Sequence, residues 1–482
     1  MSRGSGVDGG PAAGRRPRST ARDIERYGAL FAQRTKVMKS SAMRDLMALT
    51  ERDEVISLAG GLPDTSTFPA DSYASLMRTV ALDSCARALQ YGPTEGLMAV
   101  KRCVAEVMRA EGMETDHAEL LLTSGGQQVI DLVCKTLLDP GDVVVAEAPT
   151  YPGAVPTFCA YQAEVVQVTM DRDGMLIEEL EATLAELDRT GRRPKFIYTV
   201  PNFHNPAGVT LSLQRRRELV RIAAERELLV LEDNPCGLLR YEGEPLPTLR
   251  SLDDEFVIYA STFSKILSPG LRLGWAAAPA PVLAKMKIGK ASADLCSCSI
   301  SQYFVAAYFD SGRWQDYVRS LSEIYRRRRD VLLDSLAEHF PREARWTHPQ
   351  GGLFVWATLP EYIDTSDLLA RALEENVAFV PGRAAYVDGR GGSSMRLNFS
   401  GVGEDDIREG IRRIGEIVRE QVALYGTLTG APAVTAAPRE DARLGGAGLR
   451  AGTATGNAPI GSPGPPDPDL AKVLRLPRKR AG

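Results

Sequence analysis

Residues 255–265 read EFVIYASTFSK, a continuous apolar run that ends in a polar turn carrying one lysine. An apolar run without alternation is typical of a strand that is buried on both faces of a sheet. Similar runs precede it, and amphipathic helix patterns separate them. This order predicts an α/β fold with a mostly parallel sheet. The earlier runs are ELLLT (119–123), DVVVAEAP (142–149), PKFIYTVP (194–201) and LLVLED (228–233), and the two clearest helix patterns cover 127–139 and 214–227.

The character of the sequence changes near Asp310, where a long amphipathic pattern over 313–340 begins. Shorter apolar stretches follow it and predict a second, smaller α/β domain. Within the long pattern, four arginines at 326–329 are interpreted as a solvated helix face. Both ends of the chain are rich in Gly, Pro and Ser, which predicts disordered tails. The predicted division is a tail (1–25), an arm (26–67), a large domain (68–309), a small domain (310–427) and a second tail (428–482).

Composition and charge argue against several classes of protein. The chain has 482 residues and a net charge of −4, so it offers no overall positive field to nucleic acid or to an anionic membrane. The short basic end at 475–482 is interpreted as solvated charge. No apolar stretch is long enough to span a bilayer. Seven irregularly spaced cysteines suggest reduced thiols and a cytoplasmic setting, and Cys296 and Cys298 lack the partners of a zinc site, so we expect no metal.

Polar residues follow the apolar runs at the edge where a parallel sheet binds ligands, beyond the carboxyl ends of its strands. Lys265 lies there, and an amine that is partly desolvated beside cations has a lowered pKa and attacks carbonyl groups. Alone, Lys265 would be interpreted as a surface lysine. Its neighbours favour a phosphate site, because hydroxyls, a guanidinium and glycines at the start of a helix all bind anions. These neighbours are Thr262, Ser264, Arg272 and the segment TSGGQQ (123–128).

A phosphate site beside a lysine that can form a Schiff base suggests one cofactor, pyridoxal phosphate (PLP). PLP requires a carboxylate opposite its ring nitrogen, and Asp233 ends the run LLVLED at the same edge of the sheet. Asn205 could donate to the phenolic oxygen of the cofactor, and Tyr151 could stack on its ring. Taken singly, Asp233 would be interpreted as a turn or cap residue, and Asn-Pro and Tyr-Pro pairs are common in turns. The prediction therefore depends on their joint order.

Eight motifs occur in an order that closely resembles class I and II PLP-dependent aminotransferases of fold type I, most of all the branch of 2-aminoadipate and kynurenine aminotransferases. The resemblance covers about residues 35–425. It implies a homodimer with shared active sites. It also implies that the amino group of an aromatic, branched or 2-aminoadipate-like amino acid moves to a 2-oxo acid such as 2-oxoglutarate by a ping-pong mechanism. The motifs are YGPTEG (91–96), TSGGQQ (123–128), PTYPG (149–153), NPAG (205–208), EDN (232–234), STFSK (261–265), PGLRLGW (269–275) and MRLNFS (395–400).

The resemblance also implies roles for single residues. Lys265 resembles the lysine that holds the cofactor and moves a proton to and from the substrate α-carbon. Asp233 matches the partner of the ring nitrogen, and Arg396 resembles the arginine that grips the substrate α-carboxylate. The other cofactor-binding matches are Tyr91 toward the neighbouring subunit, Gly126 and Gln127 in the phosphate-side turn, Tyr151, Asn205, Thr262, Ser264 and Arg272. The other substrate-binding matches are Asn205, Gly61 within the arm segment AGGLPD (59–64), and Arg44.

Two positions depart from the family pattern. Cys236 stands where the family has a tyrosine that bonds the phenolic oxygen of the cofactor. A thiol is a weak donor, which predicts an altered proton affinity of the bound cofactor. The alternative is that Cys236 simply packs and Asn205 compensates. His204 stands where a glutamine is common and is interpreted as a loop histidine.

Other functions use the same scaffold. β-Elimination, decarboxylation and racemisation rely on the same electron sink, so they are the main alternatives to transamination. A PLP-binding regulator would carry a DNA-binding domain, and about 55 residues before LAGGLP are too few for a winged helix and a linker. An inactive binding protein is disfavoured because Lys265 is present.

Overall fold

The protein is described here by a computed structural model that covers residues 27–36, 38, 52 and 54–430. Arg44 and the predicted N-terminal tail lie outside these residues. The predicted C-terminal tail also lies outside them, apart from its first residues. Those residues belong to the last helix, α15 (Glu404–Thr429), which extends just past the predicted boundary at 427.

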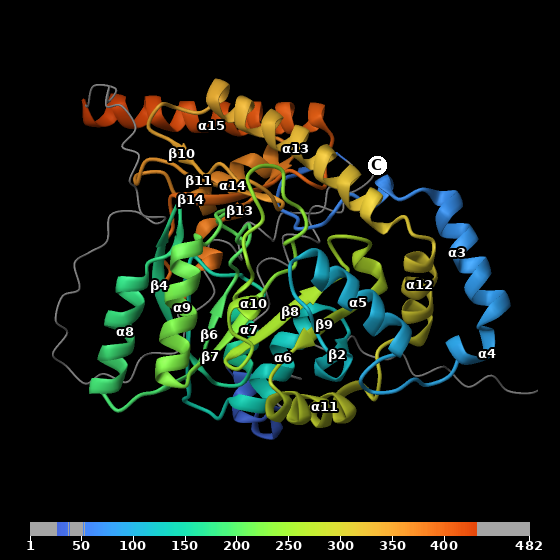
Figure 1. The fold of residues 1–482 in the computed structure, drawn as a ribbon. Coiled ribbons are helices and arrows are strands. Elements are labelled where there is room, and N and C mark those ends of the chain that lie inside the picture. The colour runs from blue at the N-terminus through green and yellow to red at the C-terminus, as the bar shows by residue number, and fades with distance from the viewer. Residues whose placement is uncertain (1–26, 37, 39–51, 53, 431–482) are drawn as a thin grey trace, which may run out of the picture.

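The large sheet places its parallel strands together, as the apolar runs predict. Five neighbouring strands run parallel, in the order β8 (Val257–Thr262), β7 (Leu229–Asp233), β6 (Pro194–Thr199), β3 (Val143–Ala148) and β4 (Glu164–Asp171). Strand β9 (Gly274–Ala277) runs antiparallel to both of its neighbours, and β5 (Gly174–Met175) runs antiparallel to β4. The α/β fold with a mostly parallel sheet is therefore confirmed. The spatial order is β2 (Leu120–Thr123), β9 (Gly274–Ala277), β8 (Val257–Thr262), β7 (Leu229–Asp233), β6 (Pro194–Thr199), β3 (Val143–Ala148), β4 (Glu164–Asp171) and β5 (Gly174–Met175) (Figure 1).

Helices cover both faces of this sheet, which explains why its strands lack polar alternation. Successive residues of one strand point to opposite faces, so Phe196 and Tyr198 belong to one core and Ile197 to the other. The first face is covered by α6 (Gly126–Leu137), α7 (Val155–Ala160) and α11 (Ala280–Asp294), and the second by α8 (Ile177–Arg189), α9 (Leu213–Arg226) and α10 (Leu249–Leu252).

A second, antiparallel sheet follows the long predicted helix. Helices α13 (Trp314–His339) and α15 lie side by side along this sheet in Figure 1 and bury apolar side chains against each other. The sheet order is β10 (Arg345–Trp346), β11 (Phe354–Thr358), β14 (Ser394–Asn398) and β13 (Val380–Pro381), and β1 (Ile56–Ser57) pairs in parallel with β12 (Val377–Ala378). The remaining helices are α3 (Ala70–Asp83), α4 (Cys85–Ala88), α5 (Met98–Ala110), α12 (Ser299–Asp310), α13 (Trp314–His339) and α14 (Thr365–Glu374), with 3₁₀ turns at Gly28–Leu30, Gln33–Lys36, Thr65–Thr67, His117–Glu119, Pro269–Leu271 and Gly382–Ala385.

The four arginines of α13 do not form one solvated face, so that interpretation is wrong for two of them. The side chains of Arg326 and Arg327 are 42% and 52% exposed. Arg328 instead donates to Asp64 at 2.7 Å, and Arg329 is buried and donates to the carbonyl oxygen of Pro349 at 2.9 Å. Successive residues of a helix differ by about 100° in direction, so four neighbours cannot share one face.

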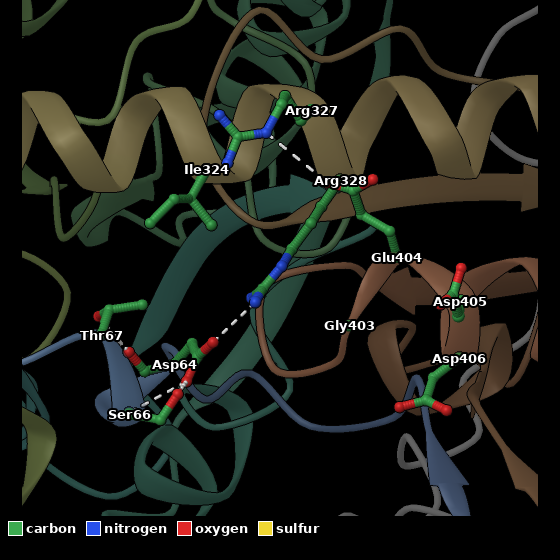
Figure 2. A pocket seen from close by; sticks show the side chains of 10 residues that line it. All are labelled: Asp64, Ser66, Thr67, Ile324, Arg327, Arg328, Gly403, Glu404, Asp405 and Asp406. Atoms are coloured by element: carbon green, nitrogen blue, oxygen red, sulfur yellow. Dashed lines mark hydrogen bonds and ion pairs between the residues drawn. The ribbon is translucent and has the colours of Figure 1, made fainter.

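Figure 2 shows a pocket between α13, the turn at 65–67 and the start of α15. Arginine and acidic side chains pair across it, with Arg328 pointing toward Asp64 and Arg327 lying 3.6 Å from Glu404. The first ion pair joins the arm to α13, and the second joins α13 to α15. The lining residues include none of the residues that sequence analysis assigns to the active site.

The described residues contain no candidate membrane span, metal-binding cluster or disulfide bond. Each helix in the described ranges is too short or too polar to cross a lipid bilayer. Among the same residues, no three or more His, Cys, Asp and Glu side chains are grouped to hold a metal ion. No disulfide bond joins any of the seven cysteines, all of which lie in the described ranges.

Candidate active site

Lys265 lies in the turn that follows β8, and its amine donates a 2.5 Å hydrogen bond to the carbonyl oxygen of Gly61 in the arm. Burial lowers the pKa of Lys265, and the cations Arg396 and Arg272 lower it further. A thiolate at Cys236 would oppose this shift, but burial raises the pKa of Cys236 to about 12, so its thiol is uncharged near neutral pH. The surroundings therefore favour the neutral amine, which is the form that acts as a base or nucleophile.

Asp233 ends β7 and is buried. Tyr198, on the neighbouring strand β6, donates a 2.7 Å hydrogen bond to its Oδ2. Burial raises the pKa of Asp233 to about 6, although the hydrogen bond from Tyr198 opposes this rise. A cation next to this carboxylate would stabilise it strongly. Tyr198 could not be predicted as a site residue from the sequence, because a tyrosine inside an apolar run looks like an ordinary core residue.

His204 lies in the loop after β6, as expected, and it is buried and paired there. Its Nε2 lies 3.0 Å from Oε2 of Glu147, and its Nδ1 accepts a 3.2 Å hydrogen bond from the backbone of Ala207. Glu147 also accepts hydrogen bonds from Thr199 and from the backbone of Val200. A buried carboxylate requires such partners, and here they fix the loop that carries the NPAG motif.

Arg396, on β14 of the second sheet, meets residues from two distant segments. Its guanidinium donates to Oδ1 of Asn205 at 3.0 Å and to the carbonyl oxygen of Ala59 at 2.7 Å, and it stacks 4.5 Å above the ring of Phe354. Burial lowers the pKa of Arg396 to about 10, which leaves the side chain charged at neutral pH. A buried cation held in this way is ready to bind a carboxylate.

The turn before α6 lies directly beside Arg272. Gly125 adopts a φ of 84°, and a Cβ at this position would come within 2.5 Å of Nη2 of Arg272. Arg272 in turn donates a 3.2 Å hydrogen bond to the carbonyl oxygen of Ser124. Only glycine allows this close approach, which places a guanidinium next to the N-terminus of a helix that begins at Gly126.

The other predicted residues on this side form short links between loops. The hydroxyls of Thr262 and Ser264 lie 2.8 Å apart, and both residues are buried. Gln127 donates to the carbonyl oxygen of Gly153 at 3.0 Å, so it joins α6 to the loop that carries Tyr151. The pKa of Tyr151 is raised by burial and by the charge on Asp233.

Tyr91, Gly61 and Arg44 come from the N-terminal part of the chain. The Tyr91 ring is 78% exposed, and no hydrogen bond or ion pair among the described residues joins its side chain to the others. Gly61 contacts Lys265 through its carbonyl, and a Cβ there would lie 3.2 Å from the Phe354 ring. Arg44 lies outside the described residues.

Cys236 is 4% exposed and belongs to the main apolar cluster. Its thiol is close enough to Lys265 and Asp233 for their charges to affect its pKa. Cys236 therefore packs in the core, as the alternative interpretation expects. No tyrosine hydroxyl is present at this position. The effect on chemistry stays a prediction.

This set of groups fits PLP. A lysine amine with a lowered pKa suits an aldehyde, and a buried carboxyl suits a protonated pyridine nitrogen. The glycine turn, the helix start and Arg272 suit a phosphate, because a Cβ at Gly125 would fill the space that the guanidinium occupies. The fold and the site together define a PLP-dependent enzyme of fold type I.

Comparison with known proteins identifies the family. The chain belongs to the aminotransferase class I and II family, whose model matches residues 53–414. It is 42% identical to aromatic-amino-acid aminotransferase 1 of Thermococcus litoralis over 83% of this chain and 96% of that one. It is 36% identical to 2-aminoadipate transaminase of Thermus thermophilus over 83% of this chain and 98% of that one. A crystal structure of Pyrococcus horikoshii kynurenine aminotransferase in complex with PMP matches with a TM-score of 0.79 and 40% identity over 84% of this chain and 100% of that one.

These findings confirm the expected family, fold type and cofactor. The protein is a PLP-dependent aminotransferase that acts on amino acids. The family assignment favours transamination over the other reactions that the same scaffold supports.

Proposed function

We propose that this enzyme transfers the amino group of an aromatic, branched or 2-aminoadipate-like amino acid to a 2-oxo acid such as 2-oxoglutarate, in two half-reactions. The observation that carries the proposal is the convergence of a lysine, a carboxyl and an arginine, Lys265, Asp233 and Arg396, from two sheets onto one site. The donor class is supported by the relatives named for aromatic amino acids, 2-aminoadipate and kynurenine.

We propose that Lys265 holds the cofactor and carries the proton of the reaction. When bound, PLP supplies an aldehyde that condenses with amines and a ring that accepts the electron pair released at the α-carbon. Once the substrate amine has displaced it, the neutral amine of Lys265 takes the α-proton and passes it to the aldehyde carbon of the cofactor within the same half-reaction. With the second 2-oxo acid, Lys265 moves a proton in the reverse direction. Asp233, tethered by Tyr198, keeps a proton on the ring nitrogen by charge.

Arg396 and Asn205 orient the substrate and the cofactor in this proposal. The planar guanidinium of Arg396 binds the α-carboxylate through two parallel hydrogen bonds. Because Oδ1 of Asn205 accepts from Arg396, its amide nitrogen faces away from that contact and donates to the phenolic oxygen of the cofactor. The ring of Tyr151 stacks on the pyridine. The phosphate is bound by the turn at Gly126 and Gln127, with Thr262, Ser264 and Arg272.

We also propose a homodimer with shared active sites. Support comes from apolar side chains that are exposed on neighbouring elements, at 71% for Leu82, 72% for Leu89 and 78% for Tyr91. In such a dimer Tyr91 reaches the phosphate of the partner subunit. We also propose a reducing, cytoplasmic setting, which the seven cysteines outside disulfide bonds support. We also propose that the large and the small domain divide near residue 310, between α12 and α13.

A panel of amino acids tests the proposed reaction. Each amino acid is mixed with the PLP-loaded enzyme, and conversion of the cofactor to its amine form is followed by absorbance. We expect aromatic or 2-aminoadipate-like donors to convert it fastest, 2-oxoglutarate to restore the starting spectrum, and a D-amino acid to leave it unchanged. Release of ammonia or carbon dioxide without formation of the matching 2-oxo acid would contradict transamination.

Replacement of Cys236 by tyrosine tests the departure from the family pattern. A hydroxyl at this position adds a hydrogen bond to the deprotonated phenolic oxygen, so we expect the apparent pKa of the bound cofactor's absorbance titration to fall by about one unit. Cys236→Phe is the matched control, because it adds the same bulk without a donor. Identical titrations of the Tyr and Phe variants would show that the hydroxyl makes no such bond.

A further inference from the structure

Lys290, on α11, is fully buried, although no step of the proposed reaction uses it. Its amine donates to both carboxylate oxygens of Asp294, at 2.6 and 2.7 Å, and lies 3.4 Å from Oε1 of Gln128. Lysines are rarely buried unless they are paired, and Asp294 is the partner that allows Lys290 to be buried. That position lies against the turn before α6.

Asp294 ties both ends of this turn to the buried lysine. Its Oδ2 accepts hydrogen bonds from the hydroxyl of Ser124 at 3.1 Å and from the amide of Gln128 at 2.8 Å. The Gln128 amide oxygen then accepts a 2.7 Å hydrogen bond from the backbone N–H of Ser124. Although burial raises the pKa of Asp294, its bonds from Lys290 and Gln128 keep that pKa below the ordinary value.

The opposite side of the turn is closed by β9. A Cβ at Gly274 would come within 2.7 Å of the backbone nitrogen of Gly126, and Arg272 bonds the carbonyl oxygen of Ser124. The turn therefore cannot move toward the sheet. Its position on the other side is set by the Lys290–Asp294 pair.

The pair also sets the local charge. Asp294 contacts the same turn that, in the proposed function, holds a phosphate. A carboxylate there would repel a phosphate dianion, and a lysine bonded to both of its oxygens cancels that charge at short range. Arg272 then remains as the cation that faces the ligand.

We propose that Lys290 and Asp294 are positioning residues for the phosphate group of PLP: they fix the turn at 124–128 and keep it free of net negative charge. This inference rests on the proposed function, in which that turn binds the phosphate. It predicts an effect on PLP that depends on the phosphate and is absent for pyridoxal, the same aldehyde without a phosphate.

The test compares the binding of PLP and of pyridoxal to full-length variants by equilibrium dialysis with absorbance detection. We expect Lys290→Met to weaken PLP binding by about tenfold, the loss that corresponds to one charge-assisted hydrogen bond, while pyridoxal binding changes by less than about twofold. The double variant Lys290→Met with Asp294→Asn should bind PLP more tightly than the single variant, because the uncompensated carboxylate is gone.

Lys135→Met is the matched control. Lys135 also joins α6 to α11, through Ser292 at 3.2 Å, but it is exposed and does not contact the turn. We expect this variant to bind both aldehydes as the wild type does. Should Lys290→Met fail to fold, Ser124→Ala removes only the hydroxyl that bonds Asp294 and should still weaken PLP selectively.

Different results would overturn different statements. Equal losses for PLP and pyridoxal, or unchanged PLP binding in both Lys290→Met and Ser124→Ala, would overturn the positioning role. A wild-type protein that binds pyridoxal as tightly as PLP would instead overturn the assignment of the turn to the phosphate, and with it part of the proposed function.

Discussion

Replacing Lys265 by alanine is expected to lower the rate of amino-group transfer by at least about a thousandfold, because the variant loses the base that moves the α-proton. Borohydride should trap the cofactor covalently on the wild type and not on the variant. The variant should still bind PLP, since the phosphate turn, Asp233 and Tyr151 do not depend on the amine.

Lys265→Arg is the informative companion to this variant. An arginine keeps the positive charge and most of the bulk but cannot act as a base near neutral pH. We expect it to be as inactive as the alanine variant, with the hydrogen bond to the Gly61 carbonyl available to its guanidinium. Transfer rates within about tenfold of wild type in either variant would exclude Lys265 as the proton carrier.

Asp233→Asn is expected to separate activity from stability. Loss of the carboxylate removes the charge that keeps the ring nitrogen protonated, so we expect the transfer rate to fall by about a hundredfold or more. In the absence of PLP, the same substitution should increase the stability of the protein at high pH. Burial raises the pKa of Asp233 to about 6 from an ordinary value of 3.8, so ionising this group in the folded chain is costly.

The sign of the stability effect follows from that shift. A carboxyl with a raised folded-state pKa contributes stability below its unfolded pKa, near 3.8, and this contribution is lost as the pH rises through about 6. At pH 8 the loss amounts to about 3 kcal/mol in the PLP-free wild type, and asparagine does not incur it. Thermal unfolding of the two PLP-free proteins should thus diverge between pH 4 and pH 7, with the variant more stable at the higher pH. Parallel curves, or a less stable variant at pH 8, would show that Asp233 is not ionised at a cost.

Much of the fold could be predicted because buried strands leave a local signal. The runs at 142–149, 194–201, 228–233 and 255–262 correspond to four adjacent parallel strands, and their carboxyl ends bring Asp233 and Lys265 to one edge of the sheet. This prediction did not require the order of the strands, because the carboxyl ends of parallel strands lie at the same edge of a sheet in any order.

Residues whose role depends on a distant partner could not be predicted from local pattern. Arg396 looks like a strand residue until β14 brings it to Asn205 and Ala59, and only the family resemblance pointed to it. Lys290 lies in a mixed sequence, KMKIGKASAD, that gives no sign of burial. Arg328 and Arg329 were misinterpreted because composition does not reveal which side of a helix meets another element.

The arm segment between β1 and Asp64 is held at both ends. Its start pairs with β12, and its end is bound by Arg328 at 2.7 Å, while the carbonyl oxygens of Ala59 and Gly61 between them bond Arg396 and Lys265. Because the segment is fixed at both ends, the number of residues between them determines where its carbonyl oxygens lie. Substitutions that preserve the backbone path are therefore tolerable here, whereas an insertion or deletion of a single residue would shift both carbonyls away from their donors at once.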